Sequence, residues 1–230
     1  MTVPVDLVAL DMAGTTIDDG GAVYEALRGA VEDGGAPVAQ PDLQAWMGTD
    51  KVEAITNLLR IGGVEPTAER VAAGFERFRE RLGQAYAGTP PTAIDGVPQA
   101  LAELRGRGIA VSLTTGFDDA VAYPLLAALG WRIGDDPEAT VDAVVTTSDV
   151  AAGRPAPYLI HRAMEKTGAR DVRRVLAAGD TAVDVQAANN AGAISVGVLT
   201  GKADPEALAT AGADHVLGGV VDLPALLGLR

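Results

Sequence analysis

The chain has 230 residues, 48% of them hydrophobic, which suffices for one large domain or for a core domain carrying a smaller inserted one. Its formal net charge of −13 argues against a nucleic-acid partner, because a phosphate backbone requires a basic surface. The absence of cysteine excludes disulfides, thiolate zinc sites and cysteine nucleophiles, and it is typical of a cytoplasmic protein.

Five short apolar runs predict buried strands, and a weaker sixth lies near Asp214. In chain order the five runs are residues 5–11, 109–115, 142–147, 174–180 and 193–200. Amphipathic helical patterns at 97–108, 120–130, 155–169 and 181–192 separate them. Buried strands that alternate with such helices predict an α/β fold, namely a Rossmann-like parallel sheet with helices on both faces.

One segment interrupts this alternation. Between about Asp18 and Ala93 no convincing strand appears, and three helix-period runs, 22–35, 51–63 and 68–88, each end in glycine. The run GTPPTAIDG, 88–96, reads as a linker back into the α/β part. We therefore predict a core domain formed by 1–17 and 94–230, and an inserted helical cap formed by 18–93.

Polar residues end the first four predicted core strands: Asp11, Thr114 and Thr115, Thr146 and Thr147, and Asp180. In an open parallel sheet, ligands bind beyond the carboxyl ends of the strands. Two carboxylates that converge there repel each other unless a divalent cation lies between them. Asp184, one helical turn after Asp180, is placed to hold a metal-bound water or to orient a cation. As turn formers and helix-capping acids these residues would need no metal, but Asp11 beside Asp180 makes a metal site the better interpretation.

The composition also limits the metal and the partners. With only two histidines and no cysteine, a metal site must consist of oxygen ligands, which suits Mg²⁺. No run approaches the roughly 18 apolar residues that span a bilayer, and MTVPVD lacks the pattern of a signal peptide, so no membrane partner is expected. The run GVLTGKA, 197–203, has the wrong glycine spacing for a phosphate-binding P-loop, and Ala203 replaces the required hydroxyl residue.

The motifs LDMAGTT, LTTG, GRPAP and GDTAVDVQAANNAG, in this order, resemble the four motifs of the haloacid-dehalogenase superfamily of phosphotransferases. The resemblance runs over essentially the whole chain, and the helical insertion lies where that family carries its mobile cap. DMAGTT together with arginine in GRP is similar to the phosphonatase branch, the phosphonoacetaldehyde hydrolase-like members. The family implies Mg²⁺ as cofactor and a small anionic phosphonate or phosphate as substrate. It leaves open a homodimer formed through the cap.

The resemblance implies a role for each matching residue. Asp11 is the expected nucleophile, because an ionised carboxylate can attack phosphorus without a base and form an aspartyl phosphate. Thr114 would hold a phosphoryl oxygen, and Arg154 would neutralise negative charge where most of the family has lysine. The expected metal ligands are Asp11, the carbonyl of Ala13, Asp180 and, through water, Asp184. The expected substrate-binding residues are Gly14, Thr15, Met47, Gly48, Thr115 and Gly116.

Ala13 distinguishes this chain from the family's phosphatases, which usually have an aspartate there that protonates the leaving group. Alanine cannot do so, and a carbon leaving group needs no acid if an iminium accepts its electrons. That chemistry requires a lysine, and Met47, Gly48 and Lys51 match the phosphonatase spacing. Asp50 and Glu53 predict a helix N-terminus that places Lys51 in the first turn. An ordinary exposed helical lysine is the competing interpretation.

Three departures lie on the aldehyde side of that pattern. Phosphonatases have histidine where this chain has Ala54, tyrosine where it has Phe117, and cysteine where it has Gly21. The hypotheses are therefore a Mg²⁺-dependent hydrolase that cleaves a C–P bond through a Schiff base on Lys51, a phosphomonoesterase similar to phosphoglycolate phosphatase, and a catalytically inactive binding or regulatory domain.

Overall fold

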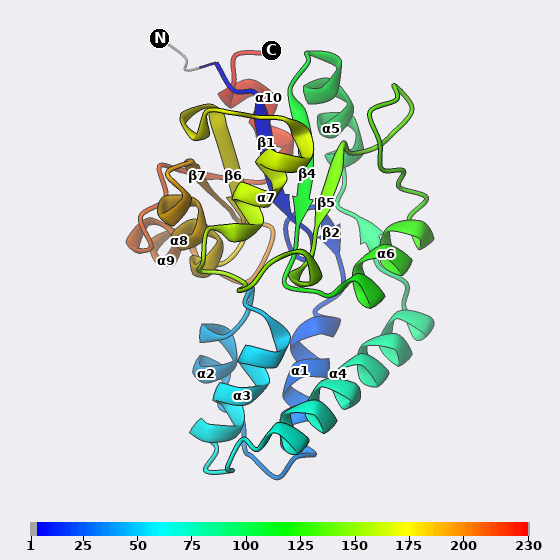
Figure 1. The fold of residues 1–230 in the computed structure, drawn as a ribbon, viewed down its shortest axis with the longest axis vertical. Helices are drawn as coiled ribbons and strands as arrows, with labels where there is room; N and C mark the ends of the chain where they lie inside the picture. Colours follow the sequence, from blue (N-terminus) through cyan, green and yellow to red (C-terminus); the bar gives the residue numbers. More distant parts are fainter. Residues whose placement is uncertain (1–3, 230) are drawn as a thin grey trace. The chain divides into compact units, whose positions relative to one another are not determined.

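The computed structural model describes residues 4–229. By its contacts the chain divides into two compact units: the chain up to Asp18 together with everything from Thr92 onward, and the segment Asp19–Pro91. The first unit is built around a six-stranded sheet, and the second contains only helices among its regular elements (Figure 1). The predicted α/β class with a helical insertion is confirmed.

All six predicted strands are present in the core sheet, and every pairing is parallel. Their order is β5-β4-β1-β6-β7-β8, so β1 lies at the centre, between β4 and β6 (Figure 1). The strands are β1 (Leu7–Asp11), β4 (Ala110–Thr114), β5 (Ala143–Val145), β6 (Val175–Gly179), β7 (Ile194–Val198) and β8 (His215–Leu217). Each is two or three residues shorter than its apolar run, because only the paired part of the run is extended.

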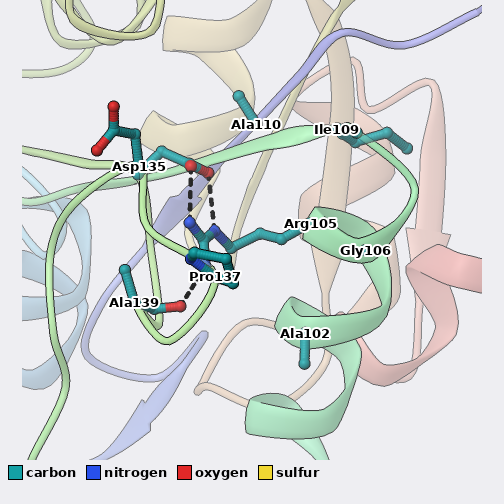
Figure 2. Close-up of a pocket in the computed structure, with 10 residues that line it drawn as sticks. Ala102, Arg105, Gly106, Ile109, Ala110, Asp135, Pro137 and Ala139 are labelled. Atoms are coloured by element: carbon teal, nitrogen blue, oxygen red, sulfur yellow. Dashed lines mark hydrogen bonds and ion pairs between the residues drawn. The ribbon is translucent and has the colours of Figure 1, made fainter.

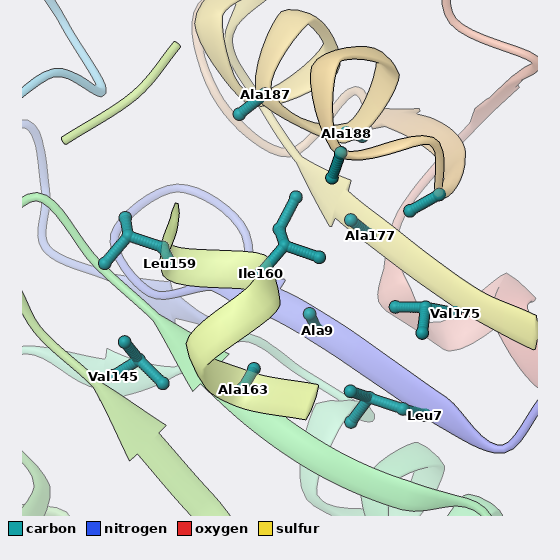
Figure 3. Packing of buried hydrophobic residues seen from close by; sticks show 12 residues of the cluster. Leu7, Ala9, Val145, Leu159, Ile160, Ala163, Val175, Ala177, Ala187 and Ala188 are labelled. Carbon is teal, nitrogen blue, oxygen red and sulfur yellow. The ribbon is translucent and has the colours of Figure 1, made fainter. Parts of the chain in front are cut away.

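Helices cover the sheet as the strand pattern predicts. Leu7 and Ala9 of β1 pack against Leu159 and Ile160 of one helix and, with Ala188 of another, form one buried cluster (Figure 3). The alternate residues of β1 point to the opposite face and are also buried, so both faces of the strand are covered. The helices of this unit are α5 (Val97–Gly106), α6 (Asp119–Ala128), α7 (Tyr158–Thr167), α8 (Ala182–Ala191), α9 (Pro205–Thr210) and α10 (Leu223–Leu226), with 3₁₀ turns at Thr147–Asp149, Val172–Arg174 and Val220–Asp222.

The helical unit contains α1 (Ala22–Glu32), α2 (Gln40–Ala45), α3 (Lys51–Ile61) and α4 (Ala68–Gly88). The long α4 packs mainly against α1 and α3. The apolar stripe of α1, which includes Val23 and Leu27, is buried. The sequence did not predict α2, because six residues are too few to show a helical period.

Two short strands were also not predicted. β2 (Ile17–Asp18) and β3 (Thr92–Ala93) pair antiparallel at the two points where the chain passes between the units. Strands of two residues carry no detectable alternation, so the segment from 88 to 96 resembled a simple linker. No helix in the described part of the chain is long and apolar enough to cross a membrane.

Candidate functional site

The strand order brings the predicted site residues to one edge of the core sheet. β4 and β5 lie on one side of β1, and β6, β7 and β8 lie on the other, so the order reverses at β1. Asp11, the last residue of β1, is in register with Thr114, the last residue of β4. Asp180 directly follows β6 on the other side. This is the carboxyl-end crevice at which open α/β sheets bind ligands.

The chain turns tightly after Asp11. The carbonyl of Met12 accepts backbone hydrogen bonds from Thr16 and Ile17, each at 2.9 Å. The Thr16 hydroxyl donates to the carbonyl of Asp11 at 2.9 Å, which fixes the backbone of Asp11. Gly14 has a φ of +88°, a conformation that glycine adopts without strain.

Three buried carboxylates converge at this edge. Asp11, Asp180 and Asp184 each offer an oxygen within 4.8 Å of the other two. Asp184 is held by its own helix, because α8 begins with a capping box in which Thr181 and Asp184 bond reciprocally. Asp184 is therefore both a helix-capping acid and a member of the acidic cluster.

Arg154 holds this cluster together. Its Nη1 lies 2.7 Å from Oδ1 of Asp11, and its Nε lies 2.9 Å from Oδ1 of Asp184. Its Nη2 donates to the hydroxyl of Thr114 at 2.8 Å and to that residue's carbonyl at 3.0 Å. A single guanidinium thus contacts three of the predicted site residues, which the single ammonium of a lysine could not do with the same geometry.

The charges of the cluster are strongly perturbed. Burial raises the pKa of Asp11 to about 6, since the attraction of Arg154 only partly offsets burial and Asp184 adds repulsion. Burial, together with repulsion from Asp11 and Asp184, raises the pKa of Asp180 well above its usual range. Burial would lower the pKa of Arg154, but Asp184 and Asp11 outweigh it and keep the pKa above its ordinary value. Three acids therefore share one arginine, and the site carries an excess of negative charge.

This excess fits a divalent cation. The donors are carboxylate oxygens, which Mg²⁺ prefers. Oδ1 of Asp184 is buried and has an ion pair with Arg154 but no hydrogen bond, so it retains capacity for a metal-bound water. Asp11, Asp180 and Asp184 are the residues that would hold Mg²⁺, and Ala13 lies in the turn beside Asp11.

Several predicted substrate-binding groups are engaged within the protein. The Thr115 N–H donates to the carbonyl of Val145 at 3.0 Å. The Gly14 N–H donates to the carbonyl of Ile17 at 2.8 Å. The Thr15 hydroxyl donates to Oδ1 of Asp180 at 3.1 Å, which places this side chain in the acidic cluster.

Gly179 is a site residue that the sequence did not reveal. A Cβ on this residue would lie 2.2 Å from Cγ of Asp184, so only glycine permits the carboxylate to approach the end of β6. The only available signal was the Gly-Asp pair at the strand end, and a glycine there is equally typical of an ordinary turn.

The helical unit carries the other predicted group. Asp50 caps α3 by accepting a hydrogen bond from the N–H of Glu53 at 2.9 Å, which confirms that Lys51 lies in the first turn. Lys51 is buried, and its Nζ donates to the carbonyl of Thr49 at 3.0 Å. Met47 is buried, and Gly48 has a φ of +79°. The competing interpretation of Lys51 as an ordinary exposed helical lysine is therefore wrong.

A cavity of about 450 Å³ opens at the opposite edge of the core sheet, where Ala110 begins β4. Arg105 crosses it and donates to both carboxylate oxygens of Asp142. It also donates to the carbonyl of Ala139 (Figure 2). These contacts fasten the loop before β5 to α5. Because the guanidinium of Arg105 forms its hydrogen bonds within the protein, we assign this cavity a structural role. It is separate from the acidic cluster.

Comparison with known proteins agrees with this geometry. A family model described as a haloacid dehalogenase-like hydrolase matches residues 5–192. The chain belongs to the haloacid dehalogenase-like hydrolase family. It is therefore a hydrolase, and its relatives include both phosphonatases and phosphatases.

Two curated relatives show the range of activities named among proteins similar to this hydrolase. Phosphonoacetaldehyde hydrolase of Bacillus cereus is 31% identical over 214 residues, which covers 87% of this chain and 78% of the relative. Phosphoglycolate phosphatase of Pectobacterium atrosepticum is 32% identical over 222 residues, which covers 96% of this chain and 92% of the relative. The resemblance to the phosphonatase branch is thus confirmed at the level of family relationship.

Solved structures share the fold of this hydrolase. A hydrolase from Pseudomonas syringae aligns with a TM-score of 0.85 at 25% identity and covers 97% of this chain and 98% of its own. A phosphonoacetaldehyde hydrolase like protein from Oleispira antarctica aligns with a TM-score of 0.82 at 24% identity and covers 99% of this chain and 92% of its own.

Proposed function

We propose that the protein is a Mg²⁺-dependent phosphonatase, which cleaves the C–P bond of a small phosphonate aldehyde through a Schiff base on Lys51 and an aspartyl phosphate on Asp11. The observation that carries the proposal is the contact of Arg154 with Asp11, Asp184 and Thr114 beside the acidic cluster. This arrangement supplies a nucleophile, a phosphoryl-binding cation and an acidic metal site at one sheet edge.

The proposed reaction begins at Lys51. Its amine condenses with the substrate aldehyde, water leaves, and an iminium forms. A carboxylate oxygen of Asp11 then attacks phosphorus, the C–P bond breaks, and its electron pair moves onto carbon to form an enamine. No acid is needed for this leaving group, which accounts for Ala13. Water then hydrolyses the aspartyl phosphate to free phosphate, and protonation and hydrolysis of the enamine release the aldehyde and restore the lysine.

The residues of the core unit act on the phosphoryl group. Arg154 and Thr114 orient its oxygens and offset its charge, while Arg154 holds Asp11 in place for in-line attack. Mg²⁺, when bound by the acidic cluster, would reduce the repulsion between an anionic nucleophile and an anionic substrate. Burial of Asp11 keeps its carboxylate poorly solvated and therefore reactive once it is ionised.

A trapping experiment tests this proposal. Phosphonoacetaldehyde and sodium borohydride, added together, should leave a reduced adduct on the peptide that contains Lys51, and the protein should lose activity. Lys51→Arg should abolish both the adduct and turnover. Lys166→Arg is the matched control, because Lys166 lies in α7 and donates to Asp149 and to the carbonyl of Val144. If Lys51→Arg hydrolyses phosphonoacetaldehyde as fast as the parent protein, the Schiff-base mechanism is wrong.

A phosphomonoesterase is the second candidate, and two observations favour it. The phosphoglycolate phosphatase relative covers more of the chain than the phosphonoacetaldehyde hydrolase does. Ala54 is fully buried, and Gly21 has a φ of +82°, so neither position presents the side chain found in phosphonatases. Turnover of phosphate esters by Lys51→Arg, with loss of activity in Asp11→Asn, would identify this alternative.

An inactive binding domain is the third candidate. The intact contacts among Asp11, Thr114, Arg154 and Asp184 argue against it, because three buried acids around one arginine serve no evident packing purpose. Absence of turnover on phosphonates and phosphate esters, together with absence of Mg²⁺ binding, would favour it.

A further inference from the structure

The turn after β7 contacts the acidic cluster, although its residues belong to none of the four family motifs. The GVLTGKA run, which does not match a nucleotide-binding loop, spans the end of β7 and this turn. The Thr200 hydroxyl donates to the carbonyl of Gly14 at 2.6 Å. The next residue, Gly201, lies against the side chain of Asp180. Two neighbouring residues of one turn therefore touch both the loop that follows the nucleophile and a proposed metal ligand.

The contact with Asp180 is very close. A Cβ on Gly201 would lie 1.8 Å from Oδ2 of Asp180 and 2.4 Å from its Cγ. A Cβ on Gly14 would lie 2.6 Å from the same Oδ2. The Asp180 carboxylate thus lies between two backbones that have no side chains, and the Thr200 hydroxyl bonds to one of them.

The other carboxylate oxygen is also held. Oδ1 of Asp180 accepts a hydrogen bond from the Thr15 hydroxyl at 3.1 Å. Asp11 and Asp184 lie within 4.8 Å and repel Asp180, so an unconstrained side chain would rotate away from them when no cation is present. The backbones of Gly14 and Gly201 pack closely against Oδ2 of Asp180 and leave the side chain little room to rotate. The carboxylate is therefore oriented toward the cluster before a cation arrives.

We propose that Thr200 and Gly201 are positioning residues that hold the Asp180 carboxylate in its metal-binding orientation. The inference rests on the metal site of the proposed function, and it assigns a role to a turn outside the predicted site. Groups that orient metal ligands typically change metal affinity by about 10- to 100-fold when they are removed. The hydroxyl of Thr200 and the missing side chain of Gly201 should each have an effect in that range.

Calorimetric titration of the protein with Mg²⁺, without substrate, measures the effect directly. Thr200→Val removes the hydroxyl at nearly constant volume and should weaken Mg²⁺ binding about tenfold, while Thr200→Ser should restore it. Gly201→Ala should weaken Mg²⁺ binding by about 100-fold, because the new Cβ must displace Asp180. With Mg²⁺ at saturation, the KM of Thr200→Val for phosphonoacetaldehyde or a phosphate ester should match that of the parent protein.

Two control variants separate positioning from general stability. Thr167→Val removes a hydroxyl that donates to the carbonyl of Ala163 at 2.8 Å, at the end of α7. Gly62→Ala introduces a Cβ 2.6 Å from Cβ of Ala36, at the end of α3 in the helical unit. Both should lower the melting temperature of the metal-free protein and leave its affinity for Mg²⁺ unchanged.

The outcomes are distinct. If Thr200→Val and Gly201→Ala bind Mg²⁺ within about twofold of the parent protein, positioning by this turn is refuted whatever their melting temperatures. If Thr200→Ser binds Mg²⁺ as weakly as Thr200→Val, the hydroxyl is not the responsible group. If the parent protein itself does not bind Mg²⁺, both this inference and the proposed metal site are wrong. Normal binding by these variants, beside a parent protein that binds Mg²⁺ and turns over substrate, refutes this inference alone.

Discussion

Asp11→Asn should abolish turnover and yet stabilise the metal-free protein. The Asp11 carboxylate is only 7% exposed, and burial outweighs the attraction of Arg154, so the ionised form is disfavoured in the folded state. Asparagine has nearly the same shape and carries no charge. Arg154 keeps its contacts with Asp184 and Thr114 in this variant, so no cation is left without a partner.

The size of the effect follows from the pKa. Folding raises the pKa of Asp11 from 3.8 to about 6. At 1.36 kcal/mol for each tenfold change in acidity, ionised Asp11 lowers the free energy of unfolding by about 3 kcal/mol at neutral pH. For a protein of this length, about 3 kcal/mol corresponds to a rise of roughly 6–12 °C in melting temperature for Asp11→Asn.

The pH dependence has a definite sign. Because the pKa is raised in the folded state, the destabilisation is complete above pH 6 and disappears as the pH falls toward 3.8, where the unfolded chain also binds the proton. The difference between Asp11→Asn and the parent protein should therefore be largest at neutral pH. It should shrink steadily between about pH 6 and pH 4.

Differential scanning calorimetry in EDTA, at a series of pH values, measures this difference. Asp135→Asn is the control, because this exposed aspartate lies at the other edge of the sheet and should show no such gain. Added Mg²⁺ should stabilise the parent protein more than Asp11→Asn, since the cation relieves the repulsion that the variant lacks. A melting temperature of Asp11→Asn at or below that of the parent protein, in EDTA at neutral pH, would refute the reasoning.

Three further substitutions test other contacts. Arg154→Lys keeps the positive charge but loses the several N–H donors of the guanidinium, so steady-state kinetics should show kcat/KM reduced about 10²–10³-fold. An unchanged kcat/KM would contradict the role assigned to Arg154. Gly179→Ala places a Cβ 2.2 Å from Cγ of Asp184, so urea unfolding should show a loss of about 1–3 kcal/mol, with weaker Mg²⁺ binding in a parallel titration. Arg105→Met leaves partly buried Asp142 with the N–H of Val111 but without its cationic partner, and it should cost about 3 kcal/mol in the same unfolding assay. Its Mg²⁺ affinity should be unchanged, and a loss of affinity would show that the two edges of the sheet are coupled.

Much of the core was predictable from the sequence because its signals are local. Continuous apolar runs mark strands that are buried on both faces, and the six runs became the six strands of the core sheet. Parallel strands bring their carboxyl ends to one edge, so the terminal positions of Asp11, Thr114 and Asp180 implied that they lie near one another. Asp50 and Glu53 marked the start of a helix by the same kind of short-range pattern.

Only the tertiary structure decided how these side chains meet. The register of β1 with β4, the three contacts of Arg154, and the close approach of Gly201 to Asp180 join residues that are far apart in the chain. A pattern along the sequence carries hydrophobic period and turn chemistry, both of which are properties of neighbouring residues. The distance between a glycine and a carboxylate on different strands depends on strand order, register and packing, and it therefore exists only once the sheet has formed.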